Sequence, residues 1–145
     1  MSQNVFVIHL FTAIFMTGLI WTIQLVHYPS FHFVDKAGFV SFEAFHSMRI
    51  SIIVLPVMLI ELLTAGALVY LLPAVRPWML ANFVLLGAIW LVTLLISARI
   101  HGELAAGYDE AKVSWLVTSN WFRTLLWSGR SLGLCFLLKT VFVNS

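Results

Sequence analysis

Three histidines, His27, His46 and His101, are the side chains of this chain best placed to do chemistry together. Each lies at one end of a long apolar run, and the topology argued below brings those three ends to the same face of a membrane. Imidazole groups ligate metals, hold haem iron and exchange protons near neutral pH. A reactive or ligand-binding site at one membrane face is therefore the first hypothesis for function.

Three chemistries fit such a cluster. Three neutral imidazoles can bind a transition metal, iron or copper, and leave one coordination position open for a substrate or oxygen. Two can hold a haem between helices, although haem is disfavoured because a bis-histidine pair normally lies deeper than these helix ends. Without any cofactor, histidine and arginine can orient and deprotonate a phenol-like molecule that comes from the bilayer. The sequence does not distinguish among these three chemistries. It also leaves open that the histidines have no chemical role and are only tolerated at the depth of the lipid headgroups.

Four apolar runs must position the histidines, and they fill nearly all of the 145-residue chain. They cover residues 5–26, 50–72, 78–98 and 121–143. At about 1.5 Å per helical residue, each run spans the roughly 30 Å of hydrocarbon in a bilayer. The composition, 61% hydrophobic and 10% charged, excludes a water-soluble domain. We predict an all-α integral membrane protein: one antiparallel four-helix bundle domain, residues 1–145, in contact with the lipid bilayer.

The number of crossings fixes which helix ends meet. After four crossings the chain is back on its starting side, so the end of the first run, the start of the second, the end of the third and the start of the fourth share one face. That face carries five basic residues and the other carries two, namely Lys36, Arg49, Arg99, Lys112 and Arg123 against Arg76 and Lys139. The positive-inside rule then places both termini outside the cytoplasm, and we expect a bacterial inner membrane.

Two other interpretations of the chain are set aside at this point. The first apolar run lacks the basic start and small-residue cleavage pattern of a signal peptide, so we expect it to be retained. The basic residues are scattered and form no patch, so nucleic acid is not an expected partner.

Local signals predict helical extensions on the histidine side. Pro29 removes a backbone donor and disfavours the helical conformation at Tyr28, so the first helix should stop there. Asp35 can cap a new helix, and the three- and four-residue spacing after it predicts that the second helix begins before the bilayer. Asp109 can cap a similar extension that runs through Trp115 into the fourth helix.

Each predicted span also carries a polar stripe at steps of three and four residues. The stripes consist of Trp21, Gln24 and His27; of His46 and Glu61; of Trp90, Thr93, Ser97 and His101; and of Asn120, Arg123, Trp127, Arg130 and Ser131. Lipid cannot satisfy polar groups, so these stripes should face the interior of the bundle.

The stripes supply the candidate site residues. The candidate metal ligands are His27, His46 and His101; the candidate catalytic residues are His46, His101, Arg123 and Glu61; and the candidate substrate-binding residues are Trp21, Gln24, Asn120, Trp127 and Arg130. Gln24 and Glu43 are the expected acceptors for the second ring N–H of the histidines. His9 lies at the opposite end of the first helix, too far away to join.

Glu61 and Arg130 are the two charges nearest the middle of the bilayer. From the same membrane side they lie about 20 and 17 Å deep at ~1.5 Å per residue. A lone charge at such depth costs several kcal/mol, so we expect the two to pair. The pair either fixes helix register or serves function, with Glu61 as a proton acceptor or substrate anchor that Arg130 keeps ionised.

Two stretches resemble a known family. Ala98-Arg-Ile-His-Gly-Glu-Leu-Ala105 and Asn120-Trp-Phe-Arg-Thr-Leu-Leu126 are similar to the end of helix 3 and the start of helix 4 in the anthrone-oxygenase-like family of small four-helix membrane proteins. Residues 42–68 resemble its second helix. The resemblance implies oxidation of anthrones to quinones by molecular oxygen without a metal. It also implies that His101, Asn120, Arg123 and Thr124 belong to the site.

The chain departs from that family in its histidines. His27 and His46 fall where the family pattern has none, which favours a metal or a different redox partner over the anthrone substrate. Our leading hypothesis is a membrane-embedded oxidoreductase or oxygenase-like enzyme for a hydrophobic aromatic or quinol-type molecule. The alternative is a non-catalytic accessory or cofactor-holding subunit, in a homo-oligomer or a larger membrane complex. An enzyme should have a cavity that ends at the histidines, whereas an accessory subunit should be tightly packed inside.

Overall fold

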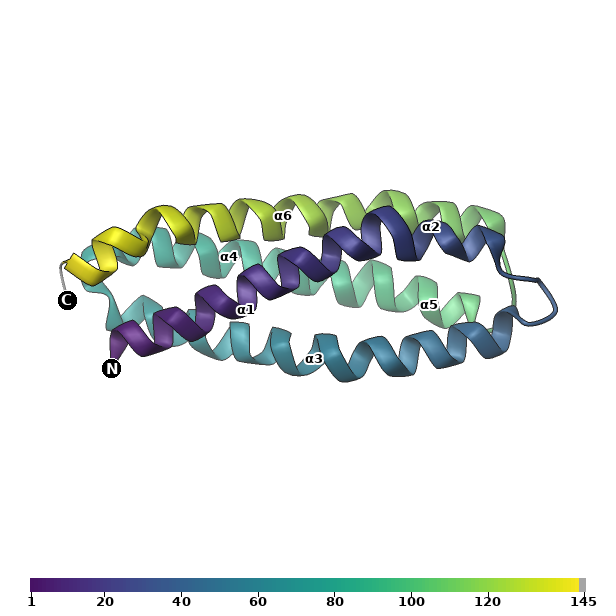
Figure 1. Cartoon of the computed structure of the whole chain (residues 1–145), viewed down its shortest axis with the longest axis horizontal. Coiled ribbons are helices and arrows are strands. Elements are labelled where there is room, and N and C mark those ends of the chain that lie inside the picture. Colours follow the sequence, from purple (N-terminus) through teal and green to yellow (C-terminus); the bar gives the residue numbers. More distant parts are fainter. Residues whose placement is uncertain (144–145) are drawn as a thin grey trace.

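The computed structural model describes residues 1–143 as four long antiparallel helical segments (Figure 1). The first consists of α1 (Ser2–Thr22), η1 (Ile23–His27), α2 (Tyr28–Ser30) and η2 (Phe31–Phe33); the second of α3 (Phe39–Leu71); the third of η3 (Pro73–Val75), α4 (Arg76–Val92), η4 (Thr93–Ser97) and α5 (Ala98–Leu104); and the fourth of α6 (Glu110–Val143). All four segments are long and apolar enough to cross a membrane. The predicted all-α membrane bundle is confirmed.

The distribution of side chains is the reverse of that in a water-soluble bundle. Large apolar side chains such as Phe11, Leu63 and Phe136 are 68%, 72% and 84% exposed. Polar side chains, among them Glu43 and Asn120, are fully buried. Lipid offers apolar side chains the same environment as a protein core, while only the bundle interior offers partners to polar groups. The fold is therefore built for a bilayer.

The extensions predicted on the histidine side exist. α3 runs without interruption from Phe39, and α6 begins at Glu110, where Asp109 Oδ1 accepts from the backbone N–H of Lys112 over 3.1 Å. Asp35 has a different role from the predicted one. Its carboxylate accepts from the Ala37 backbone N–H and so caps the turn before α3, while α3 itself starts without a side-chain cap.

The predicted end of the first helix at Tyr28 and Pro29 was wrong, because helical structure continues to Phe33. In a straight α-helix the Pro29 ring would clash with the carbonyl of Leu25. Here the chain forms a π turn, η1, in which the Tyr28 N–H bonds to the Ile23 carbonyl five residues earlier. The wider turn accommodates the proline, and the helix carries His27 and Tyr28 onward into the bundle.

Two apolar clusters fill the interior and a polar layer separates them. One includes Met16, Met58 and Trp127 on the histidine side, and the other includes Phe6 and Leu134 near the termini. Between them each of the four segments contributes buried polar side chains, namely Thr12, Glu61, Asn82, Arg130 and Ser131. Within residues 1–143, buried polar side chains therefore occur in this middle layer as well as at the histidine end.

Candidate functional site

The three predicted histidines lie together at the end of the bundle that carries the extensions. His27 Nε2 and His46 Nδ1 are 2.7 Å apart, a hydrogen bond in which one nitrogen donates and the other accepts. The centroid of the His46 ring lies 4.5 Å from that of His27 and 5.1 Å from that of His101. The structure therefore brings side chains from the first, second and third spanning segments to one place.

A carboxylate and a phenol hold His101 at its two nitrogens. His101 Nδ1 donates to Glu43 Oε1 over 2.7 Å, and the Tyr28 hydroxyl lies 3.0 Å from His101 Nε2. An ionised carboxylate only accepts, so in neutral His101 the hydrogen is on Nδ1, and Nε2 accepts from Tyr28. Glu43 has the acceptor role expected for it. Tyr28 is not among the sequence-based candidates, because the break predicted at Pro29 removed it from the helix.

Two π turns orient these side chains. η1 ends at His27, and η4 ends at Ser97, one helical turn before His101; in η4 the Ala98 N–H bonds to the Thr93 carbonyl five residues earlier. A π turn holds one more residue than an α-helical turn, so it rotates everything after it about the helix axis. Such turns occur frequently at functional sites. The two π turns direct the His27 and His101 side chains toward α3. In an uninterrupted α-helix, side chains at these two positions would point in another direction.

The arrangement does not fit a metal site made of His27, His46 and His101. Both nitrogens of His101 are engaged, by Glu43 and Tyr28, and one nitrogen each of His27 and His46 is engaged in their mutual hydrogen bond. Within residues 1–143, no group of three or more His, Cys, Asp or Glu side chains is placed to hold a metal ion. His27 and His46 are hydrogen-bonding partners of each other, and His101 is the partner of Glu43 and Tyr28.

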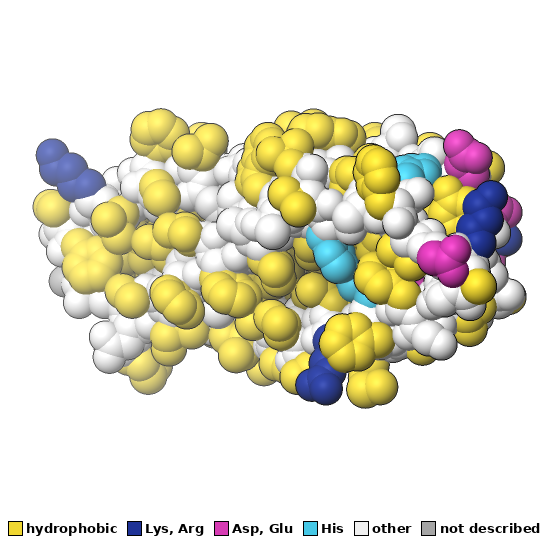
Figure 2. Space-filling model, turned by 45° about the vertical axis from the view of Figure 1, so that its right-hand side comes forward, with side chains coloured by type: hydrophobic (Ala, Val, Ile, Leu, Met, Phe, Trp, Pro, Cys, Tyr) yellow, Lys and Arg dark blue, Asp and Glu magenta, His cyan; other side chains and the backbone are white. Residues whose placement is uncertain are grey.

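A groove of about 360 Å³ opens on the outer surface between the first spanning segment and α3, and two of the histidines line it. Its walls are Leu19, Thr22, Ile23, Val26, Phe42, Phe45, Ile50 and Ile53, and its strongly polar groups are His27, His46 and Arg49. Figure 2 shows histidine side chains at the floor of a hollow edged by hydrophobic side chains. The volume lies in the usual range for small-molecule sites. The groove opens to where lipid would lie, so an apolar ligand can reach it sideways.

Two buried polar atoms of the histidine cluster, His46 Nε2 and Glu43 Oε2, have no hydrogen-bond partner within the described part of the chain. Arg49 is exposed at the rim, with its guanidinium carbon 5.4 Å from the centre of the Phe45 ring. A ligand in the groove thus meets the His27 and His46 side chains and the Arg49 cation.

Gln24, Asn120 and Arg123 form a network beside the histidines, and Arg123 joins it to the cluster at the Tyr28 side chain. None of the three is part of the groove wall. Asn120 Nδ2 donates to Gln24 Oε1 over 2.9 Å, and Arg123 Nη1 donates to Asn120 Oδ1 over 3.3 Å and to Ser97 Oγ over 3.2 Å. Since Gln24 lies in η1 and Ser97 in η4, this network ties the two π turns together. Gln24 is therefore not the ring acceptor that we expected from the sequence.

Trp21 is the most exposed of the predicted substrate-binding residues. Its side chain is 37% exposed, its Nε1 donates to Ser128 Oγ over 2.9 Å, and its ring packs edge-on against Trp121. These contacts join α1 to α6 at the lipid surface, away from the groove.

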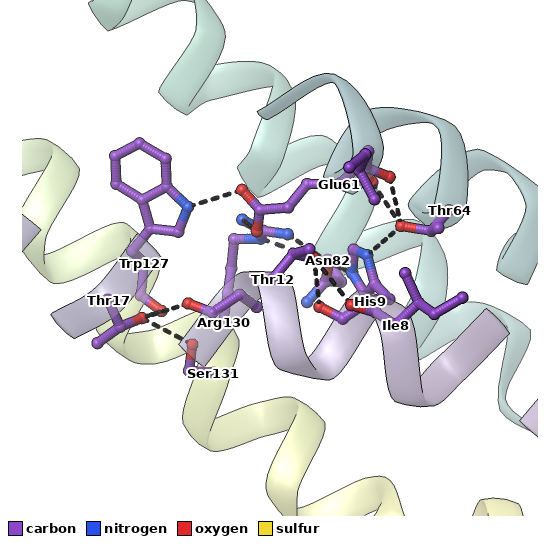
Figure 3. Close-up of polar contacts among 12 residues, drawn as sticks. Ile8, His9, Thr12, Thr17, Glu61, Thr64, Asn82, Trp127, Arg130 and Ser131 are labelled. Carbon is purple, nitrogen blue, oxygen red and sulfur yellow. Dashed lines mark hydrogen bonds and ion pairs between the residues drawn. The ribbon is translucent and has the colours of Figure 1, made fainter. Parts of the chain in front are cut away.

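The predicted pair of Glu61 and Arg130 forms in the middle layer (Figure 3). Arg130 Nη1 donates to Glu61 Oε1 over 3.0 Å, and Trp127 Nε1 donates to Glu61 Oε2 over 3.1 Å. All three side chains are at most 1% exposed. Glu61, Trp127 and Arg130 satisfy one another and are not brought to the histidine groove.

His9 and Asn82 complete this layer. The sequence analysis did not identify them as neighbours of the Glu61–Arg130 pair. His9 Nε2 lies 3.1 Å from Asn82 Oδ1 and His9 Nδ1 lies 2.8 Å from Thr64 Oγ1, while Arg130 Nη2 donates to Asn82 Oδ1 over 3.1 Å. Figure 3 shows these side chains converging from α1, α3, α4 and α6. Depth in the predicted spans did not reveal them, because His9 and Asn82 lie 4 residues from the span ends at 5 and 78, whereas Glu61 and Arg130 lie 11 and 13 residues from those at 72 and 143.

The chain matches no protein-family profile, no curated protein and no solved structure. Its function must therefore be argued from the groove and the side chains around it.

Proposed function

We propose that this protein is a membrane-embedded oxidoreductase of the oxygenase-like kind, which binds a hydrophobic phenol or quinol in the groove between the first spanning segment and α3. The single observation that carries the proposal is that this apolar groove is lined by His27 and His46. An accessory subunit needs no such opening, whereas an enzyme for a lipid-soluble molecule needs a side entrance and a polar end.

The chemistry supported best is removal of a hydroxyl proton by the histidine pair. His46 Nε2 is buried, so the His46 ring must turn toward the groove for a substrate O–H to donate to it. His46 Nδ1 then carries the hydrogen that it donates to His27 Nε2. When the substrate gives up its proton to Nε2, His46 Nδ1 passes its own proton to His27. The products are a substrate oxyanion, a neutral His46 and a His27 imidazolium. Charge is balanced, and no cofactor takes part in this step.

Arg49 and the buried triad of Glu43, His101 and Tyr28 have supporting roles in this proposal. Arg49 lies at the same groove and stabilises the oxyanion electrostatically. His101 packs against the His46 ring, and its two hydrogen bonds hold it in place. The oxyanion is the electron-rich form that reacts with dioxygen. For a quinol, two electrons and two protons pass to dioxygen and give the quinone and hydrogen peroxide.

The resemblance to the anthrone-oxygenase-like family agrees with this proposal in reaction class and in the absence of a required metal. The orientation we propose, with both termini outside the cytoplasm of a bacterium, places the histidine end and its basic residues on the cytoplasmic side.

The test is oxygen consumption by the full chain in lipid nanodiscs, with hydrophobic quinols and anthrones as substrates. We expect turnover by the wild type and a fall of roughly 10²- to 10⁴-fold for His46→Ala. His32→Ala is the matched control, because that ring is exposed and lies outside the groove, and it should keep the wild-type rate. Turnover that is equal in wild type and His46→Ala would contradict the proposal.

A further inference from the structure

A second groove, of about 190 Å³, lies on the outer surface between α4 and α6, which run side by side (Figure 1). Its walls are Trp78, Ala81, Asn82 and Leu85 from α4, and Gly129, Arg130, Gly133, Leu134 and Leu137 from α6. It shares no lining residue with the groove at the histidines. We call it the α4–α6 groove.

Two glycines of α6 leave this groove open. A Cβ atom built at Gly129 or at Gly133 would meet nothing within 4 Å, so no atom of residues 1–143 fills the space in front of them. The two glycines are four residues apart and exposed, so they lie one above the other on the same face of the helix. In membrane helices such a pair lets another group approach the backbone closely. The groove therefore has room for a slender apolar chain that runs along α6.

Asn82 brings an unused hydrogen-bond donor to this groove. Its side chain is 8% exposed, and its hydrogen bonds within residues 1–143 all go to Oδ1, which accepts from Arg130 and from His9 in the bundle interior. The Nδ2 group has no such partner, and it is not enclosed, so it is reached from the groove that Asn82 lines. An N–H group that faces hydrocarbon without an acceptor is costly. A ligand that supplies an acceptor atom is therefore favoured here.

Two cations mark the end of the groove that faces the lipid headgroups. Arg76 lies two residues before Trp78 on α4, and Lys139 lies two residues after Leu137 on α6, and both are exposed. Hydrocarbon does not solvate charges, so these side chains lie at the membrane surface. Asn82 is one helical turn further in, ~6 Å below Trp78 at ~1.5 Å per residue. The ester carbonyls of a phospholipid lie at this depth, between the phosphates and the hydrocarbon.

We infer that the α4–α6 groove binds one phospholipid, whose ester carbonyl accepts from Asn82 Nδ2 and whose acyl chain lies along Gly129 and Gly133. An acyl chain alone fills the space but offers no acceptor, whereas the ester supplies the carbonyl at the depth of Asn82. The lipid phosphate is then at the level of Arg76 and Lys139, whose charges complement it. The site does not depend on the function proposed for the groove at the histidines.

The experiment compares nanodiscs of two phosphatidylcholines that have the same chains, one with ester and one with ether linkages. The ether lipid keeps the phosphate and the chains but lacks the carbonyls. The readout is the thermal unfolding midpoint of the full chain. We expect the wild type to unfold roughly 3–6 °C higher in the ester lipid, which corresponds to about one hydrogen bond that only the folded state makes.

Gly133→Leu tests whether this difference arises in the α4–α6 groove. The leucine side chain fills the groove and leaves Asn82 in place, so the midpoints in the two lipids should become equal. Gly18→Leu is the matched control, because Gly18 is also exposed, has nothing within 4 Å of a built Cβ, and lies outside this groove. It should keep the full difference between the ester and ether lipids.

Asn82→Asp removes the Nδ2 hydrogens and keeps an oxygen for Arg130, so it should also abolish the difference. If one of the two groove variants does not fold, the other decides the question. Equal midpoints of the wild type in both lipids, or a difference that persists in the folded groove variants, would overturn the inference. Equal midpoints together with stabilisation by an added hydrophobic quinone, lost in Gly133→Leu, would also overturn it and assign Asn82 to a quinone carbonyl.

Discussion

Glu43 Oε1 accepts a hydrogen bond from His101 Nδ1 over 2.7 Å and so joins the second and third spanning segments inside the histidine cluster. Glu43 is fully buried, and Ser47 Oγ donates to the same oxygen. This contact fixes which nitrogen of His101 carries the hydrogen and which way its ring faces. The same hydrogen bond holds the His101 ring between the Tyr28 hydroxyl and the His46 ring.

Glu43→Gln should therefore reduce quinol oxidation without unfolding the bundle. The amide oxygen can still accept from His101, but the negative charge that favours the hydrogen on Nδ1 is gone. We expect a fall of roughly tenfold in kcat and an unchanged thermal midpoint within a few degrees. Glu103→Gln, at an exposed surface pair, is the control and should behave as wild type. If Glu43→Gln matched wild type in kcat, this carboxylate would have no part in the reaction.

Tyr28→Phe tests the hydroxyl at the other nitrogen of His101. The side chain is 4% exposed, and phenylalanine preserves its packing while it leaves His101 Nε2 without its donor. We expect a loss of about 1 kcal/mol in unfolding free energy and a lower oxidation rate. The measurement is denaturant unfolding in nanodiscs or detergent together with the oxygen assay. Tyr70→Phe, at a side chain that is 80% exposed, should change neither quantity.

Arg130→Leu should be much more damaging than the double change of Arg130 and Glu61 to leucine. The single change leaves a buried carboxylate without its cation and costs roughly 3–5 kcal/mol, whereas the double change removes both charges. Asn82 loses its guanidinium partner in both variants, so this contribution cancels in the comparison. The measurement is the fraction of folded protein after extraction and the unfolding midpoint of each variant. Equal stability of the two variants would contradict the expected cost of a buried Glu61 carboxylate without its cation.

Ile53→Trp should close the groove, and Ile52→Trp should not. Ile53 lines the groove, while its neighbour Ile52 is 62% exposed and is not part of the wall. The two variants have the same composition and differ only in the face of α3 that carries the indole. We expect Ile53→Trp to weaken binding of a hydrophobic quinol by roughly tenfold or more. Fluorescence titration with the quinol measures this, and similar affinities for the two variants would mean that the ligand binds elsewhere.

The fold and part of the site were predictable from the sequence because the bilayer imposes strong constraints. Four runs long enough to span it fix the number of helices, and an even number of crossings brings His27, His46 and His101 to one end. The pairing of Glu61 with Arg130 followed from depth alone. These inferences need only the rise of a helix and the cost of an unpaired charge.

The remaining features could not be predicted because they depend on tertiary packing. The π turn η1 lets the helix pass Pro29, and local propensity argued for the opposite. Tyr28 became a partner of His101 only because of that turn. Likewise, the turn η4 makes Ser97 available to Arg123, so Arg123 belongs to a network that ties the two turns together and not to the groove wall.

The most direct measurement of the central claim is the ionisation of a bound phenol. A hydrophobic naphthol, whose anion absorbs at longer wavelength than its neutral form, is added to the protein in nanodiscs at neutral pH. We predict that the wild-type protein produces the anion band in proportion to bound naphthol, that His46→Ala binds the naphthol but does not produce the band, and that His32→Ala produces it fully. An anion band of equal size in wild type and His46→Ala, or a bound naphthol that stays neutral in both, would contradict the account.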